Sequence, residues 1–339
     1  MGKKLFYMVV DSETATLPYA DEIAQGDPER KKKIAIAKPL VYDIGWTICD
    51  RAGVIHDRKQ FLIAETFSVP AVFNTAYYAE KRPIYLEMLK KGETVIKPWN
   101  EVMEIFMTDL EKVDSVGAFN AMFDFKKAIP FTELYIKMLY SPDYFKWEEI
   151  QRNSCRRIAF EKPSNDKNPD FDPDHFLFRG RLYDLFDLWG LATTHLLNNV
   201  TYKNNCLKHG MLTNSGVYFK TSAETSYRYL CDKYDLMESH TALDDAEIET
   251  FILSKIAAKH AVTAGIKAFP FRELGYTDDF CKRRKVPNLS ECEAVYEAIA
   301  AYVDAKIETD GDNISNYTCG LIKRLQRLAD YAGFECLYN

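Results

Sequence analysis

Two acidic residues, Asp11 and Glu13, interrupt a segment that otherwise has the composition of a buried strand, KLFYMVVDSETA. Because successive side chains of a strand point to opposite faces, residues two positions apart share a face. Two carboxylates on one buried face repel each other, and their burial is costly unless a cation compensates the charge. Taken alone, the pair is also compatible with an exposed edge strand. As a buried pair, it predicts a strand that carries part of a cation site.

The composition limits the classes of protein to consider. The 339 residues are 47% hydrophobic and 28% charged, which is enough apolar surface for a sizeable core. A net charge of −6 argues against a passive nucleic-acid-binding protein, so any such contact must be local. The eight cysteines form no CxxC pair and indicate reduced structural thiols in a cytoplasmic protein. We expect neither a membrane span nor a signal peptide, because every apolar run is too short.

The order of the expected elements is typical of an α/β protein with a mixed sheet flanked by helices. Alternating apolar residues predict a strand at 4–15 and another at 113–120. They also predict two strands within 40–67, one on each side of the turn DRAG. Apolar residues at helical spacing predict helices at 73–89, 98–113, 131–140, 181–197, 225–236 and 242–261.

Two polar segments interrupt this pattern and are expected to be insertions. The first, at about 16–39, carries the run DPERKKK, and the second, at about 141–180, is rich in Asp, Asn and Pro. Residues 1–261 are expected to form one domain that contains both insertions. Residues 262–339 are predicted to be a helical C-terminal extension, because amphipathic segments follow there.

Two further segments place acids at the ends of apolar elements. In VGAFNAMFDF, Asp124 follows Asn120 by four positions at an expected strand-to-helix transition. In SHTALDDAEIETFI, Asp245 lies at the start of a helix, five positions after His240. With the acidic pair of the first strand, these carboxylates could hold Mg²⁺ or Mn²⁺, which prefer oxygen ligands. A histidine beside such a site is placed to act as a general base.

These residues also have structural interpretations. Asp124 could complement the dipole at a helix N-terminus, and His240 alone could be a capping or core histidine. Asp244 is assigned to structure, because TALD has the spacing of a capping box. Asp184 and Asp187, in LYDLFDLWG, are expected to be hydrogen-bonded structural acids on an apolar helix.

The three motifs resemble those of the DEDDh 3′–5′ exonucleases, a family that includes the proofreading subunits of bacterial replicative polymerases, ribonuclease T and oligoribonuclease. The matching residues are Asp11, Glu13 and Thr14 in D-x-E-T, Asn120, Phe123 and Asp124 in H-N-x-x-F-D, and His240, Ala242 and Asp245 in H-x-A-x-x-D. Phe119 stands in place of the histidine of the second motif. The resemblance covers roughly residues 4–256 and implies a ribonuclease-H-like fold.

The resemblance also implies a chemistry: two Mg²⁺ or Mn²⁺ ions would assist hydrolysis of nucleic-acid phosphodiesters from the 3′ end to nucleoside 5′-monophosphates. Asp11, Glu13 and Asp245 would hold the ion that activates the attacking water. Asp11 and, through water, Asp124 would hold the ion that stabilises the leaving 3′-oxygen. His240 would accept the proton of the attacking water.

The resemblance implies single-stranded DNA or RNA 3′ ends as the substrate. The backbone around Thr14 would contact the terminal nucleotide, and Asn120 is the second expected substrate-binding residue. The C-terminal region could bind a replication or repair partner. An alternative hypothesis is a catalytically weak module that binds nucleic-acid 3′ ends within a replication or repair complex. The presence of all four carboxylates and the histidine favours the enzyme.

Overall fold

The computed structural model describes residues 5–16, 39–140, 172, 174–213, 218–262, 286, 289–311, 316–332 and 336–338. Most of the two expected insertions, at 16–39 and 141–180, lies outside these residues. The end of the second insertion is described, and it is not a loop excursion. Its residues His175–Phe178 form a strand that pairs with the next segment of the chain.

The chain divides into two compact units. The first comprises Met1–Leu191 and Met237–Leu274, and the second comprises Ala192–Leu236 and Gly275–Asn339. This division differs from the boundary expected at residue 261, because the segment before Met237 groups with the C-terminal helices.

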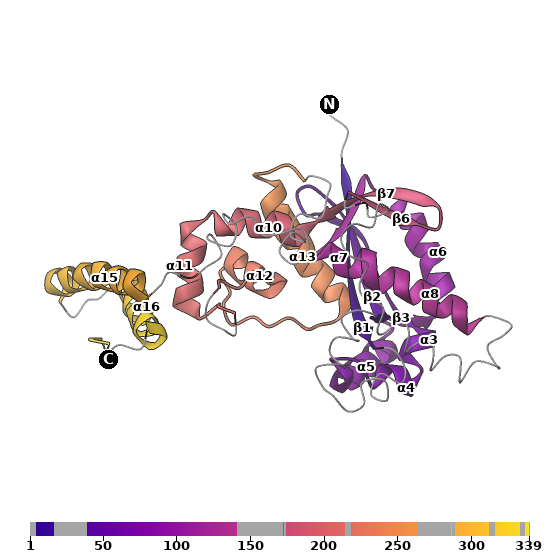
Figure 1. Ribbon diagram of the computed structural model, residues 1–339, viewed down its shortest axis with the longest axis horizontal. Coiled ribbons are helices and arrows are strands. Elements are labelled where there is room, and N and C mark those ends of the chain that lie inside the picture. The colour runs from indigo at the N-terminus through magenta and orange to yellow at the C-terminus, as the bar shows by residue number, and fades with distance from the viewer. Residues whose placement is uncertain are drawn as a thin grey trace. The chain divides into compact units, whose positions relative to one another are not determined.

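The first unit contains a seven-stranded mixed sheet with the strand order β4-β3-β2-β1-β5-β7-β6 (Figure 1). The strands are β1 (Phe6–Ala15), β2 (Leu40–Asp50), β3 (Ile55–Ile63), β4 (Val95–Lys97), β5 (Ser115–Ala118), β6 (His175–Phe178) and β7 (Arg181–Asp187). Strands β1, β5 and β7 run parallel to one another, whereas β2 is antiparallel to both of its neighbours. The α/β class with a mixed sheet is thus confirmed.

Helices flank this sheet, as expected. They are α3 (Ala64–Phe67), α4 (Pro70–Phe73), α5 (Arg82–Lys91), α6 (Trp99–Leu110), α7 (Ala121–Phe123), α8 (Ile129–Leu139) and α13 (Ala242–Ala257), with the short turns η1 (Ala79–Lys81) and η2 (Asp124–Ala128). The helix expected at 181–197 is only half helical. Its first part is strand β7, and α10 (Leu188–Leu197) begins after it. Pairing with β5 and β6 overrides the helical spacing of the apolar residues in that part.

Strand β2 lies at the centre of the core and is buried along its whole length. Its two faces pack against different helices (Figure 1). On one face, a Cβ on Gly45 would lie only 2.4 Å from the backbone nitrogen of Leu243, so the first turn of α13 lies directly on the strand. On the other face, the indole nitrogen of Trp46 donates a hydrogen bond to Asp109 of α6 at 2.9 Å. The sheet is therefore covered on both sides.

The second unit is mainly helical. It contains most of α10 together with α11 (Val200–His209), α12 (Ala223–Cys231), α15 (Leu289–Asp310) and α16 (Asn316–Ala332). Helix α16 contacts both α15 and α11, which ties the C-terminal pair to the preceding segment of the chain. Within the described part of the chain, no helix has both the length and the apolar character needed to cross a membrane. Free thiols are present at Cys49, Cys206, Cys231, Cys319 and Cys336.

Candidate functional site

Asp11 and Glu13 share one face of β1. In the antiparallel pair with β2, Asp11 lies opposite Gly45 and Glu13 lies opposite Asp43. Directly opposed residues share a face, and the first turn of α13 lies on Gly45. Both acids therefore face the start of α13. The register shifts between Glu13 and Thr14, where Tyr42 of β2 has no partner on β1. Such a bulge bends the strand that contains the extra residue, which here is β2.

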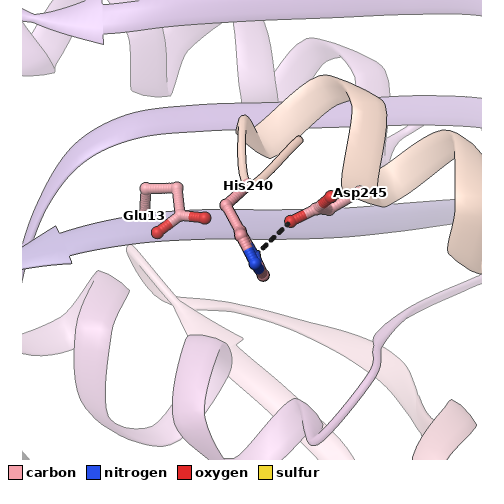
Figure 2. Close-up of side chains that lie close together, drawn as sticks. All are labelled: Glu13, His240 and Asp245. Carbon is pink, nitrogen blue, oxygen red and sulfur yellow. Dashed lines mark ion pairs between the residues drawn. The ribbon is translucent and has the colours of Figure 1, made fainter. Parts of the chain in front are cut away.

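The start of α13 brings the third motif to this face. One potential ligand atom from each of Glu13, His240 and Asp245 lies within 4.8 Å of the others (Figure 2). Glu13 comes from β1, His240 from the loop before α13, and Asp245 from the helix itself. Asp43 of β2 fixes the helix start, because its carboxylate accepts a hydrogen bond from the backbone N–H of Ala242 at 3.0 Å.

His240 is held in an unusual conformation. Its φ of 53° lies in the left-handed region, which a residue with a side chain adopts at a cost. Its Nδ1 lies 3.7 Å from Asp245 and 3.9 Å from Glu238. Its ring stacks on Tyr78 with the centroids 4.4 Å apart. Asp244 is hydrogen-bonded to the hydroxyl of Thr241 at 2.9 Å, in agreement with a structural role.

The second motif reaches the same site through a sharp turn after β5. Asn120 has a φ of 74°, a left-handed conformation that asparagine tolerates better than most residues. Asp124 then lies at the start of a π-helical turn, a feature that often occurs at functional sites. Its carboxylate accepts a hydrogen bond from Ser12 at 2.5 Å. Because Ser12 alternates with Asp11 and Glu13 along β1, this bond holds Asp124 against the strand but does not itself place its carboxylate beside the acidic pair. The charge of Asp124 raises the pKa values of both acids, which places it near them.

Two buried carboxylates hold this turn in place. Asp187, the last residue of β7, accepts hydrogen bonds from the backbone N–H groups of Asn120 and Ala121 at 3.2 and 3.4 Å. Glu249 of α13 accepts one from Phe119 at 3.1 Å. Asp187 is thus a hydrogen-bonded structural acid, as expected. It lies on a strand and not on the expected helix, because its segment pairs with β5.

Glu249 is an acid of the site that the motifs did not single out. It is 3% exposed and follows Asp245 by four positions on α13. Residues four apart on a helix share a face, so this spacing was the available signal. The charge of Glu249 is the largest charge effect on the pKa of Asp11, which places Glu249 within the cluster.

Burial and mutual repulsion raise the pKa of the clustered carboxyl groups. Burial, and then the charge of Asp245, raises the pKa of Glu13 to about 9. The pKa values of Asp124 and Asp245 each rise to about 7, with burial as the largest cause. Burial, and then the charge of Glu249, raises the pKa of Asp11 well above its usual value. Without a cation, these carboxyl groups therefore tend to bind protons, because the folded protein compensates their negative charge poorly.

This donor set fits divalent cations. Oδ1 of Asp245 is buried and has no hydrogen-bond partner among the described residues. Leaving a buried carboxylate oxygen without a partner is costly, and a cation would provide one. Carboxylate oxygens suit Mg²⁺ and Mn²⁺. The imidazole of His240 also lies close enough to Glu13 and Asp245 to serve as a ligand.

The two expected substrate-binding residues lie at the same edge of the sheet. Thr14 is the penultimate residue of β1, and Asn120 follows the end of β5 by two positions. Because β1 and β5 are parallel, their carboxyl ends meet at one edge. Both residues are partly buried.

Comparisons of the chain with protein-family models, with curated proteins and with solved structures found no match. Functional assignment of this site therefore depends on its motifs, geometry and electrostatics.

Proposed function

We propose that the protein is a metal-dependent 3′–5′ exonuclease with a ribonuclease-H-like fold. It hydrolyses DNA or RNA from a free 3′ end and releases nucleoside 5′-monophosphates. The observation that carries the proposal is the convergence of three motifs that are far apart in the chain. One potential ligand atom from each of Glu13, His240 and Asp245 lies within 4.8 Å of the others. Asp124 is hydrogen-bonded to Ser12 of β1, the strand that carries Glu13.

The electrostatics of the cluster favour an enzyme over a passive binding module. A site that only binds nucleic acid would present positive charge to the phosphates. Here burial, and then repulsion by neighbouring carboxyl groups, raises the pKa values of Asp11, Glu13 and Asp245. Once ionised, such a cluster would repel a phosphate backbone unless divalent cations lay between the carboxylates and the phosphates. The same cations are what phosphodiester hydrolysis needs.

Two bound divalent ions would neutralise the carboxylates and the charge that develops on the phosphate in the transition state. Asp11, Glu13 and Asp245 would hold one ion, and Asp11 and, through water, Asp124 would hold the other. His240 would accept a proton from the attacking water. We assign this transfer to Nε2, because Nδ1 faces the carboxylate of Asp245, which would stabilise the imidazolium that forms.

Single-stranded oligonucleotides with a 5′ label test the proposal directly. With Mg²⁺ or Mn²⁺, the labelled DNA or RNA should shorten progressively from its 3′ end, and 5′-mononucleotides should accumulate. A chelator should stop the reaction, and a circular single strand should remain intact. Products with 3′-phosphates, or cleavage of the circle, would contradict the proposal. Tight binding of 3′ ends without hydrolysis would support the binding-module alternative.

A further inference from the structure

We propose that Tyr78, Lys81 and Tyr85 form a clamp that positions His240 for proton transfer. The inference rests on the proposed function and names residues that act through the general base. The clamp comes from the segment that contains η1 and the first half of α5, which is far from His240 in the sequence.

The first part of the clamp holds the imidazole ring. The rings of Tyr78 and His240 are stacked, with centroids 4.4 Å apart and planes inclined by 14°. The ammonium group of Lys81 lies 4.6 Å from the centroid of Tyr78, a distance typical of a cation–π contact. One face of the imidazole is therefore covered by a ring that is itself held in place. Because Asp245 lies beside Nδ1, the imidazole has few other orientations.

The second part of the clamp holds the backbone that carries the imidazole. The ammonium group of Lys81 donates a hydrogen bond to the carbonyl of Ser239. The hydroxyl of Tyr85 lies 3.5 Å from the carbonyl of His240, as a long hydrogen-bond donor. Tyr85 is fully buried, so this contact connects the loop to the core.

His240 needs such support. Its left-handed backbone conformation persists only where the surroundings hold it. It also precedes the first residue of α13 by two positions, in a loop without regular secondary structure. A displacement of about 1 Å at a reacting group can reduce a rate by about 100-fold. Loss of the clamp should therefore reduce turnover without removing any catalytic group.

Tyr78 gives a cleaner test than Lys81. The charge of Lys81 also lowers the pKa values of Glu13 and Asp245, so its removal would change the metal site as well. In Tyr78→Leu the stacked ring is lost but apolar bulk remains. Tyr78→Phe is the matched control, because it keeps the ring and removes only the hydroxyl.

We expect Tyr78→Leu to lower kcat by about 10- to 100-fold, with KM and Mg²⁺ affinity within about twofold of the parent values. Tyr78→Phe should retain kcat within about twofold. In a chain that already carries His240→Ala, Tyr78→Leu should cause no further loss, because a residue that acts through His240 has nothing left to position. Parental kcat in Tyr78→Leu, or an equal further loss in the double variant, would overturn the clamp.

A spectroscopic measurement separates the clamp from the proposed function. In the protein without metal, the ring current of Tyr78 should shift the NMR signals of the His240 ring protons. Tyr78→Leu should move these signals and Tyr78→Phe should retain them. If the parent protein shows no nuclease activity with either metal, the proposed function fails. The chemical shifts of the His240 ring protons then still test whether Tyr78 holds the imidazole. An active parent whose His240 signals do not move in Tyr78→Leu would refute the clamp alone.

Discussion

His240 occupies a position that suits both a general base and a metal ligand, because it lies 3.7 Å from Asp245 and close to Glu13. Hard cations prefer oxygen to imidazole nitrogen, which favours the general base. We predict that His240→Ala lowers turnover by about two to four orders of magnitude, the range for a positioned proton acceptor. Its affinity for Mg²⁺ should barely change. Turnover on labelled oligonucleotides and calorimetric titration with Mg²⁺ check both parts.

His260→Ala is the matched control, because His260 is exposed just beyond the end of α13. That variant should keep parental turnover. A His240→Ala protein with parental turnover would exclude the role as general base. A variant that has lost a metal ion would identify His240 as a ligand.

Some acids of the site could be predicted from the sequence and others could not, because their hydrogen-bond partners lie at different distances along the chain. Asp11, Glu13 and Asp245 stand at short, fixed spacings within motifs, so the sequence alone could single them out. Glu249 and Asp43 bind backbone N–H groups of elements that are far away in the chain, at Phe119 and Ala242. Only the folded sheet brings these partners together, so no local pattern could predict those contacts.

The first turn of α13 can lie close to Asp11 and Glu13 because the residue of β2 that it packs on is a glycine, Gly45. A Cβ on Gly45 would lie 2.4 Å from the nitrogen of Leu243 and 2.6 Å from the carbonyl carbon of Ala242. Both are backbone atoms that cannot move without the helix. We predict that Gly45→Ala displaces the first turn of α13, lowers the free energy of unfolding by about 1–3 kcal/mol and reduces turnover. Urea unfolding and the nuclease assay measure these effects.

Gly92→Ala provides the comparison for that prediction. Gly92 has a φ of 72° at the end of α5, and a Cβ there would have no neighbour within 4 Å. Its replacement should cost about 1 kcal/mol through backbone strain alone and leave turnover unchanged. Parental stability and turnover in Gly45→Ala would show that the helix does not depend on this close approach.

Among the elements, the strands β6 and β7 were the least predictable. The apolar residues of β7 have a spacing that also fits a helix, and β6 lies inside a segment whose composition favours a loop. Their strand structure arises from pairing with each other and with β5. In contrast, β1 and α13 have strong periodic patterns of their own and form where the sequence predicts them.

At the scale of the whole molecule, the division into units was not predictable from the order of segments. Residues 192–236 interrupt the first unit between β7 and the loop of His240, and they group with the C-terminal helices. The contact between α11 and α16 joins parts of the chain that are far apart. Such contacts leave no periodic signal in either segment.

The raised pKa values predict how the stability of the protein without metal depends on pH. In the folded protein the pKa values of Asp124 and Asp245 are about 7 and that of Glu13 is about 9, against values near 4 in unfolded chains. Between about pH 6 and 9 the folded state therefore binds more protons, so the free energy of unfolding falls as pH rises. The lowered pKa values of Asp109 and Glu133 act only at acidic pH.

Urea unfolding at pH 6 and pH 9, with chelator or with saturating Mg²⁺, tests this dependence. With chelator, the protein should be less stable at the higher pH. Mg²⁺ should remove most of the difference, because the ions take the place of the protons and stabilise the folded state by mass action. Equal stability at both pH values with chelator would mean that burial and repulsion do not raise the pKa values of these carboxyl groups.

The number of divalent ions that the chain binds tests the central claim most directly, because the claim is that three separate motifs build one site for two cations. Titration with Mn²⁺, followed by the electron paramagnetic resonance signal of the unbound ion, gives this number. We predict two ions per chain, with affinity for both lost in Asp11→Asn, since Asp11 would contact both. Asp184→Asn, which removes an exposed carboxylate on β7, should bind Mn²⁺ as the parent does. An Asp11→Asn protein that still binds two ions as tightly as the parent would contradict the site.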